Sequence, residues 1–270
     1  MQVRARVRLG CASVARRARD GFALTIVISI SVQDGVVLAS DSAVEHRGQV
    51  YYSAEKTLQL IKGLPIGVLI AGDAAINNKA FIDVLKDFGA QCARRTGAGG
   101  LDRNTCTVEG VVRRLQDYLR SMAPMQVAKL RSTLIIAGYS AGSDTPEVWN
   151  LIFDSSEGIS VSQIWSPTEY GVCWEGSGEC LHRLMSDEFT TGADGEKDMS
   201  SPTLVTPGMP IHDAIALTRF LMDATIGYVR FRVDLQPKTV GGPVDMAVIT
   251  RHEGFRWVQR KKLSGPSAGR

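Results

Sequence analysis

The sequence predicts an α+β protein arranged as a four-layer αββα sandwich, with two antiparallel sheets between helical layers. Two observations support this prediction. Several short segments alternate apolar and polar residues, as half-buried strands do, whereas longer segments repeat their apolar residues at helical spacing. The segments follow the order strands, two helices, strands, two helices, strands. Helices grouped in this way suit a core built from layers packed on one another.

The first strands are predicted between residues 25 and 71. Thr25–Val32 alternates β-branched and small polar residues, Asp34-Gly35 is a hairpin turn signal, and Val36–Asp41 returns beside the first strand. Residues 51–61 and 66–71 form a second predicted pair. Because all these strands precede the first helix, we expect them to pair antiparallel.

The rest of the chain continues this order without an internal linker. Helical spacing predicts helices over 73–88, 107–122, 181–185 and 211–226. Strands are predicted over 132–139, 147–154, 159–164 and 170–174, with a closing hairpin of 244–250 and 255–258. We therefore expect three parts: a basic extension at 1–24, one domain at 25–260 and a disordered tail at 261–270. A polar segment at 190–203 is predicted to be mobile.

Charge is distributed unevenly along the 270 residues. The net charge is +3, but residues 1–24 hold six arginines and one aspartate, a charge of +5 that leaves −2 for the remainder. A nearly neutral body gives no reason to expect a nucleic-acid partner. No apolar run approaches the roughly 18–20 residues that cross a bilayer, so no membrane partner is expected.

Cysteine and histidine usage favours a cytoplasmic protein without a metal. The five cysteines are odd in number, none are spaced C-x-x-C, and a chain of this size needs no disulfides, which indicates reduced thiols. The four histidines are scattered and show no metal-ligand spacing. We expect neither a metal nor a cofactor.

Residues 1–24 are rich in arginine and lack a continuous apolar centre, so they do not form a secretory signal. Three explanations stay open: a propeptide, an organelle-targeting peptide, or an upstream extension from a wrongly assigned start codon. We favour the third, in which Leu24 is encoded by a non-standard start codon and read as Met. Removal of that Met would leave Thr25 first in the mature protein.

Short motifs follow one another in order along the body. They are Thr25, Asp34–Ser42, Glu55-Lys56, Ala71–Ala74, Ala137–Tyr139, Gly176–Gly178 and Gly241-Gly242. Together they make the chain resemble the proteasome β-type subunit family of the N-terminal-nucleophile hydrolases, of the bacterial proteasome-like or ancestral β-subunit type. The resemblance extends from Thr25 to about Val258 and implies the same four-layer fold.

The resemblance implies roles for individual residues. Thr25 is similar to the nucleophilic threonine of the family. Its free α-amine, with a reference pKa of about 7.7–8.0, would be the general base. Asp41 and Lys56 match the charged pair beside the nucleophile, and Ser177 matches a supporting serine. Gly72 matches the donor of the oxyanion hole, whose backbone N–H would stabilise the transition state. The chain departs from the family before Gly241-Gly242, where an aspartate and a serine are missing.

The activity implied is that of a threonine-type amidohydrolase, specifically an endopeptidase-like enzyme that acts on peptides or proteins inside a self-compartmentalised homo-oligomer. Whether an ATPase partner exists is left open.

Two alternatives stay open as well. The chain could be a non-catalytic, α-like structural subunit of the same fold. It could also be a serine hydrolase that uses Ser140, since Gly138–Gly142 fits the G-x-S-x-G pattern. That pattern works only on a turn from a strand to a helix, and here another predicted strand follows.

Overall fold

The computed structural model describes residues 25–46, 48–76, 79–94, 100–122, 130–185, 204–206, 208–233 and 240–261. The predicted basic extension at 1–24 and the predicted mobile segment at 190–203 lie outside these residues. The predicted tail lies outside them as well, apart from Lys261. The division of the chain into these three parts therefore stays a prediction.

The first of two large sheets holds the start and the end of the described chain. Its order is β12-β1-β2-β13-β14, and every neighbouring pair is antiparallel. Its strands are β1 (Ile26–Val32), β2 (Gly35–Ser40), β12 (Gly171–Gly176), β13 (Asp245–Thr250) and β14 (Gly254–Gln259). The hairpin of β1 and β2 confirms the predicted strand pairing, although the turn residues are Gln33-Asp34 and Gly35 already belongs to β2.

The second large sheet is built from the middle of the chain, in the antiparallel order β11-β10-β9-β6-β5. Its strands are β5 (Thr57–Gln59), β6 (Ile66–Gly72), β9 (Arg131–Gly138), β10 (Glu147–Asp154) and β11 (Gly158–Trp165). Two small ribbons accompany it. They pair β3 (Val44–His46) with β4 (Gln49–Tyr51), and β7 (Ala75–Ile76) with β8 (Lys79–Ala80).

The two large sheets pack face to face through an apolar core. Val27 and Leu38 of the first sheet cluster with Leu69 and Ile135 of the second. The sequence predicted a half-buried β1, but all seven of its residues are buried. The reason is that its other face is also covered, because Ile28 and its neighbours pack under the longest of the described helices.

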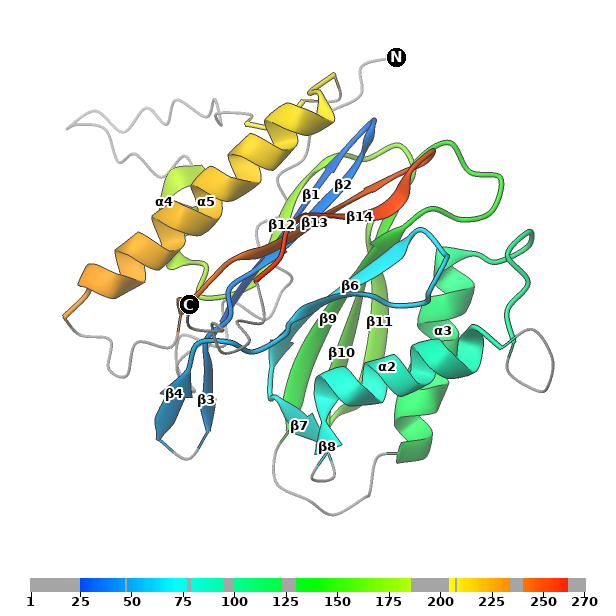
Figure 1. The fold of residues 1–270 in the computed structure, drawn as a ribbon, viewed down its shortest axis with the longest axis horizontal. Coiled ribbons are helices and arrows are strands. Elements are labelled where there is room, and N and C mark those ends of the chain that lie inside the picture. The colour runs from blue at the N-terminus through cyan, green and yellow to red at the C-terminus, as the bar shows by residue number, and fades with distance from the viewer. Residues whose placement is uncertain are drawn as a thin grey trace, which may run out of the picture.

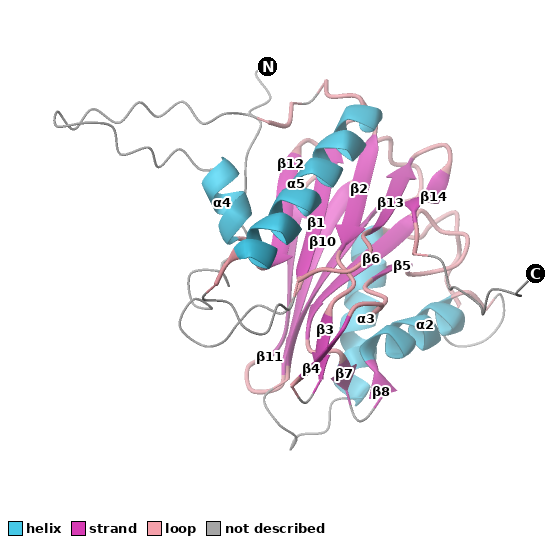
Figure 2. Cartoon of the chain, turned by 60° about the vertical axis from the view of Figure 1, so that its left-hand side comes forward, coloured by secondary structure: helices cyan, strands magenta, loops and turns pink. Residues whose placement is uncertain are grey.

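Four helices are described: α2 (Phe81–Cys92), α3 (Val108–Met122), α4 (Glu179–Met185) and α5 (Ile211–Phe231). In Figure 1, α5 lies along the outer side of β1 and β2, and the short α4 packs against α5. On the other side of the molecule, α3 lies against β9, β10 and β11, while α2 approaches the β7–β8 ribbon. Figure 2 shows the same separation of α4 and α5 from α2 and α3.

The predicted four-layer αββα sandwich is wrong as a description of this fold. The described residues form a mostly β protein of fourteen strands, all paired antiparallel, with only four helices. The physical reason is that the helices do not build complete layers. Among the described helices, α5 is the one that lies along the first sheet, and the seven-residue α4 contacts α5. Part of the segment predicted to be helical forms the β7–β8 ribbon instead.

That ribbon changes the start of the first helix. The sequence predicts a helix from Asp73, but α2 begins at Phe81, after β7 and β8 have paired. The predicted strand over 51–61 is also interrupted, since β4 ends at Tyr51 and β5 begins at Thr57. This interruption contains Lys56, which can therefore turn its side chain toward the end of the first sheet.

Within the described residues, no helix combines the length and apolar character needed to cross a membrane. Four of the cysteines, Cys92, Cys106, Cys173 and Cys180, are buried, and none of them forms a disulfide bond within the described residues. Cys11 lies outside the described residues.

Candidate active site

Thr25 lies immediately before β1 and is only 4% exposed. Its carbonyl oxygen accepts a hydrogen bond from the backbone N–H of Ser177, at 2.7 Å. Since β12 pairs with β1 up to the pair of Ile26 and Gly176, this bond continues the ladder by one residue. Sheet pairing therefore holds the backbone of Thr25 in place.

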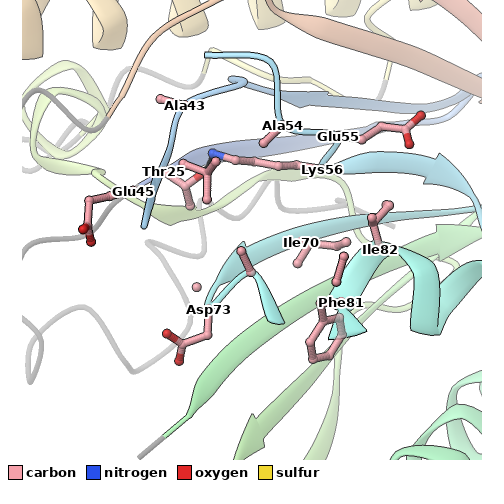
Figure 3. A pocket seen from close by; sticks show the side chains of 14 residues that line it. Thr25, Ala43, Glu45, Ala54, Glu55, Lys56, Ile70, Asp73, Phe81 and Ile82 are labelled. Atoms are coloured by element: carbon pink, nitrogen blue, oxygen red, sulfur yellow. Dashed lines mark hydrogen bonds between the residues drawn. The ribbon is translucent and has the colours of Figure 1, made fainter. Parts of the chain in front are cut away.

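The side chains of Thr25, Asp41 and Lys56 converge at the end of the first sheet. The Thr25 hydroxyl donates to Oδ1 of Asp41 at 2.7 Å. The Lys56 ammonium donates to the same oxygen at 2.7 Å and also to the Thr25 hydroxyl oxygen. Figure 3 shows the Lys56 side chain extended across the site, with its nitrogen beside Thr25. The structure thus brings three of the predicted residues into one hydrogen-bonded cluster.

Backbone groups hold the Asp41 carboxylate. Oδ1 also accepts from the N–H of Ile26 at 3.2 Å, and Oδ2 accepts from the N–H groups of Ala43 at 3.2 Å and Gly241 at 3.0 Å. Asp41 is fully buried, and an ionised carboxylate needs such donors when water is excluded. The donors orient the carboxylate so that Oδ1 faces both Thr25 and Lys56.

Lys56 is a buried cation whose pKa lies below its ordinary value of 10.5. Burial is the main cause, because it disfavours the charged form. The charge and hydrogen bond of Asp41 raise the pKa without cancelling that effect, and the nearby Lys261 ammonium lowers it further. Lys56 therefore gives up its proton more readily than a surface lysine. While it stays protonated, it favours negative charge on the Thr25 oxygen.

A cavity of about 300 Å³ opens beside this cluster and could hold part of a substrate. Its lining is mixed, with apolar side chains such as Ile70 and Phe81 on the side across from Thr25 and Lys56 (Figure 3). The carboxylates of Glu45 and Asp73 lie at its edge. Thr25 is thus buried by its neighbours, yet it borders the space where a reacting group would bind.

Gly72 lines the same cavity, at the end of β6, and adopts a left-handed φ of +112°. A Cβ there would lie 2.3 Å from the carbonyl oxygen of Arg131, so only glycine fits. Ser177 reaches Thr25 through its backbone N–H, as described above, and does not line the cavity that the described residues outline. The roles of an oxyanion donor and a supporting serine stay predictions for these two residues.

Sequence reasoning missed two charged residues beside the site, Asp245 and Lys261. Asp245 opens β13, where its side chain is 1% exposed, and the Lys261 ammonium forms an ion pair with it. Asp245 could have been noticed from the sequence, because it is an acidic residue within an otherwise apolar strand. Lys261 gave no signal, because it falls in a segment predicted to be a disordered tail.

Ser140 has the surroundings of a structural residue. Its hydroxyl accepts a hydrogen bond from the N–H of Val108 at 2.9 Å, at the start of α3, and donates to Glu147. The turn after it leads into β10 and not into a helix. The strand-to-helix turn that the G-x-S-x-G pattern requires is therefore missing at this serine.

No family model and no curated protein matches the chain. A solved structure has a similar fold. It is the helical assembly of the Anbu complex from Pseudomonas aeruginosa, with a TM-score of 0.58, 17% sequence identity and coverage of 88% of each chain. At this identity the likeness shows a shared fold and nothing about activity.

The assignment to the proteasome β-type subunit family is therefore corrected. No family model supports it, and the structural likeness is to an Anbu subunit at an identity that shows the fold alone. Several of the matched motif residues have a structural reason to be present. Gly72, Gly176, Gly241 and Gly242 all have positive φ, so the turns of the fold require glycine there whatever the protein does.

Proposed function

We propose that this protein is a threonine-type amidohydrolase whose nucleophile is Thr25 and whose substrates are peptides or proteins. The observation that carries the proposal is the contact of the Thr25 hydroxyl with both a buried carboxylate and a buried ammonium, at the edge of a cavity. A purely structural threonine at the start of a strand does not need a buried ion pair. Burying two charges is costly, and such pairs often mark functional sites.

The chemistry follows from the reactivity of a hydroxyl group, which becomes an effective nucleophile only beside a base. If the mature protein begins at Thr25, its own α-amine accepts the hydroxyl proton while Oγ1 attacks the carbonyl carbon of the substrate. The ammonium of Lys56 favours the developing negative charge on Oγ1. The leaving amine takes up the proton, and the same α-amine then activates the water that hydrolyses the ester on Thr25.

Gly72 is proposed to donate its backbone N–H to the oxyanion of that reaction. It borders the cavity together with Thr25, which supports this role. Ser177 is proposed to support Thr25, since its backbone already contacts the Thr25 carbonyl. The chain's own groups supply every role in this scheme.

We propose further that the protein acts as a homo-oligomer. The solved structure with the similar fold is described as a helical assembly, and this chain exposes large apolar side chains on α5. Phe220 is 55% exposed and Phe231 is 78% exposed. A second copy of the chain could cover such side chains in an assembly.

The decisive experiment compares three proteins: the full chain, a form that begins at Thr25, and that form with Thr25→Ala. Each is incubated with a mixture of fluorogenic peptide amides, and separately with a β-lactone probe that acylates a hydroxyl nucleophile. Among the three proteins, we expect turnover in the form that begins at Thr25 and in neither of the others. Only in that form should mass spectrometry locate a probe adduct on Thr25. Thr25→Ser, which keeps a hydroxyl, is the matched control and should retain labelling.

Full activity in the untrimmed chain would refute the role of the α-amine, because the nitrogen of Thr25 is then part of a peptide bond. Labelling of Ser140 would support the serine hydrolase instead. Absence of turnover and of labelling in every form, with the fold intact, would leave the non-catalytic structural subunit.

A further inference from the structure

Lys261 is a part-buried cation close enough to the Thr25 cluster for its charge to act on Lys56. Its side chain is 13% exposed, and its ammonium donates to Oδ2 of Asp245, to the hydroxyl of Ser42 at 3.1 Å and to the carbonyl oxygen of Ala54 at 2.9 Å. An ammonium has three protons, so these three acceptors use all of them. Lys261 also anchors its own backbone, because its N–H donates to Oδ1 of Asp245 at 2.8 Å.

Each of these acceptors belongs to a segment that carries part of the site. Ser42 directly follows Asp41, and Ala54 lies two residues before Lys56. Asp245 pairs with Ser40 across β13 and β2, one residue before Asp41. Ser42 and Ala54 come from the same early part of the chain and Asp245 comes from β13, and one side chain joins the three segments.

The same contacts extend to the backbone group that holds Asp41. The Ser42 hydroxyl, while accepting from Lys261, donates to the carbonyl oxygen of Pro243 at 2.7 Å, and the Ser42 N–H donates to the carbonyl oxygen of Gly241 at 3.0 Å. Gly241 in turn donates its N–H to Oδ2 of Asp41 at 3.0 Å. Lys261 is therefore linked through Ser42 to the loop that orients the Asp41 carboxylate.

We propose that Lys261, paired with Asp245, is a positioning residue of the active site that ties together the segments carrying Asp41, Lys56 and Gly241. The inference rests on the proposed function, in that its catalytic consequence requires Thr25 to be the nucleophile. It adds a second electrostatic effect, since the positive charge of Lys261 opposes the protonation of Lys56. The charged groups around Lys56 are Asp41 and Lys261, with Glu45, Glu55 and Asp73 along the shared cavity.

The test measures Lys56 directly and needs no turnover. In the full chain, all lysines are acetylated with trace acetic anhydride at a series of pH values, and mass spectrometry follows the labelling of each one. Lys261→Met removes the cation and keeps an unbranched side chain, whereas Lys261→Arg keeps the charge. We expect the pH midpoint of Lys56 labelling to move upward in Lys261→Met and to stay near the wild-type value in Lys261→Arg.

Arg260→Met is the matched control. Arg260 is the sequence neighbour of Lys261, but it is exposed and pairs with the half-buried Glu55 at 2.9 Å, a carboxylate that keeps a second partner in Lys86. Removal of Arg260 should leave the Lys56 midpoint unchanged. The midpoint of the exposed Lys79, which pairs with Asp87, should stay the same in every variant. If Lys261→Met leaves the Lys56 midpoint where Arg260→Met leaves it, the electrostatic effect on the site is refuted and the proposal fails.

The role of Lys261 in holding the three segments together is tested separately, by measuring activity. Lys261→Met leaves the buried Asp245 carboxylate without its counter-charge, which could unfold the protein. A second variant, Asp245→Asn/Lys261→Met, therefore removes both charges. In the form that hydrolyses peptides, kcat/KM should fall about 100-fold in this double variant, as misplacement of catalytic groups typically costs. If the double variant keeps the wild-type kcat/KM, Lys261 only neutralises Asp245 and its positioning role is refuted. If Lys261→Met shifts the Lys56 midpoint but no form of the protein hydrolyses peptides, the electrostatic effect stands and the proposed function is refuted.

Discussion

The backbone N–H of Gly241 donates a hydrogen bond to Oδ2 of Asp41 at 3.0 Å, across 200 residues of sequence. This contact leaves Oδ1 to face Thr25 and Lys56. The aspartate and serine of the family that the sequence resembles are missing before Gly241-Gly242, yet the loop reaches the site through the backbone N–H of Gly241. Residues 234–239 of that stretch lie outside the described structure.

The buried pair of Asp41 and Lys56 predicts a strong dependence of stability on both partners. Asp41→Asn leaves the Lys56 ammonium buried without its counter-charge, which should lower the free energy of unfolding by about 3–5 kcal/mol. Adding Lys56→Met to that variant removes the stranded charge, so the double variant should be more stable than Asp41→Asn alone. Urea unfolding of the four proteins measures this cycle. Strictly additive losses would mean that the two side chains do not interact.

Lys56 also predicts a pH dependence of stability. Its pKa in the folded protein lies below the ordinary 10.5, so between these two values the unfolded chain binds more protons than the folded one. Stability contributed by this group must therefore rise with pH through the folded pKa and level off above 10.5. Relative to Lys56→Met, the wild-type protein should gain free energy of unfolding between neutral pH and pH 10.5. If the difference in free energy of unfolding between the wild-type protein and Lys56→Met falls over this window, the lowered pKa of Lys56 is contradicted.

Gly72 should tolerate no side chain. In Gly72→Ala the new Cβ meets a backbone oxygen at 2.3 Å in addition to the strain of a positive φ. Gly142 is the matched control, because its φ is +75° and no atom lies within 4 Å of the added Cβ. Gly142→Ala should cost about 1–2 kcal/mol of conformational strain. Gly72→Ala should cost about 1–3 kcal/mol more through overpacking, as measured by urea unfolding.

Ser140→Ala separates the serine alternative from the threonine proposal. Loss of the hydroxyl leaves the Val108 N–H without its acceptor, so the free energy of unfolding should fall by about 1–3 kcal/mol. Hydrolysis and β-lactone labelling, measured at a temperature where both proteins are folded, should be unchanged. A loss of labelling in Ser140→Ala, with Thr25→Ala fully active, would reverse the assignment of the nucleophile.

Phe220→Asp should weaken self-association. It places a charge on the exposed side of α5, where burial against a second copy would be costly. Arg113→Gln, on the exposed surface of α3, changes the net charge by the same amount and serves as the control. Light scattering coupled to size exclusion should give a smaller mass for Phe220→Asp only. Equal masses for all three proteins would place any interface away from Phe220.

Much of the local structure could be predicted because it depends on neighbours in sequence. The structure places the hairpin turn at Gln33-Asp34, and this turn sets the register that pairs Val27 with Ser40 and so brings Asp41 next to Thr25. The apolar spacing of residues 108–122 likewise predicted α3 to within one residue at its start. In these elements the period of the side chains and the chemistry of the turn suffice.

The sequence by itself therefore determined the longer strands and the central hairpin, whose register brings Asp41 next to Thr25. Tertiary structure decided what surrounds them: the complete burial of β1, the ribbon that delays α2, and the incomplete helical cover that makes the fold mostly β. It also decided the lowered pKa of Lys56 and the positions of Gly241, Asp245 and Lys261. These features depend on contacts between residues far apart in sequence, and neither periodicity nor turn signals carry information about such contacts.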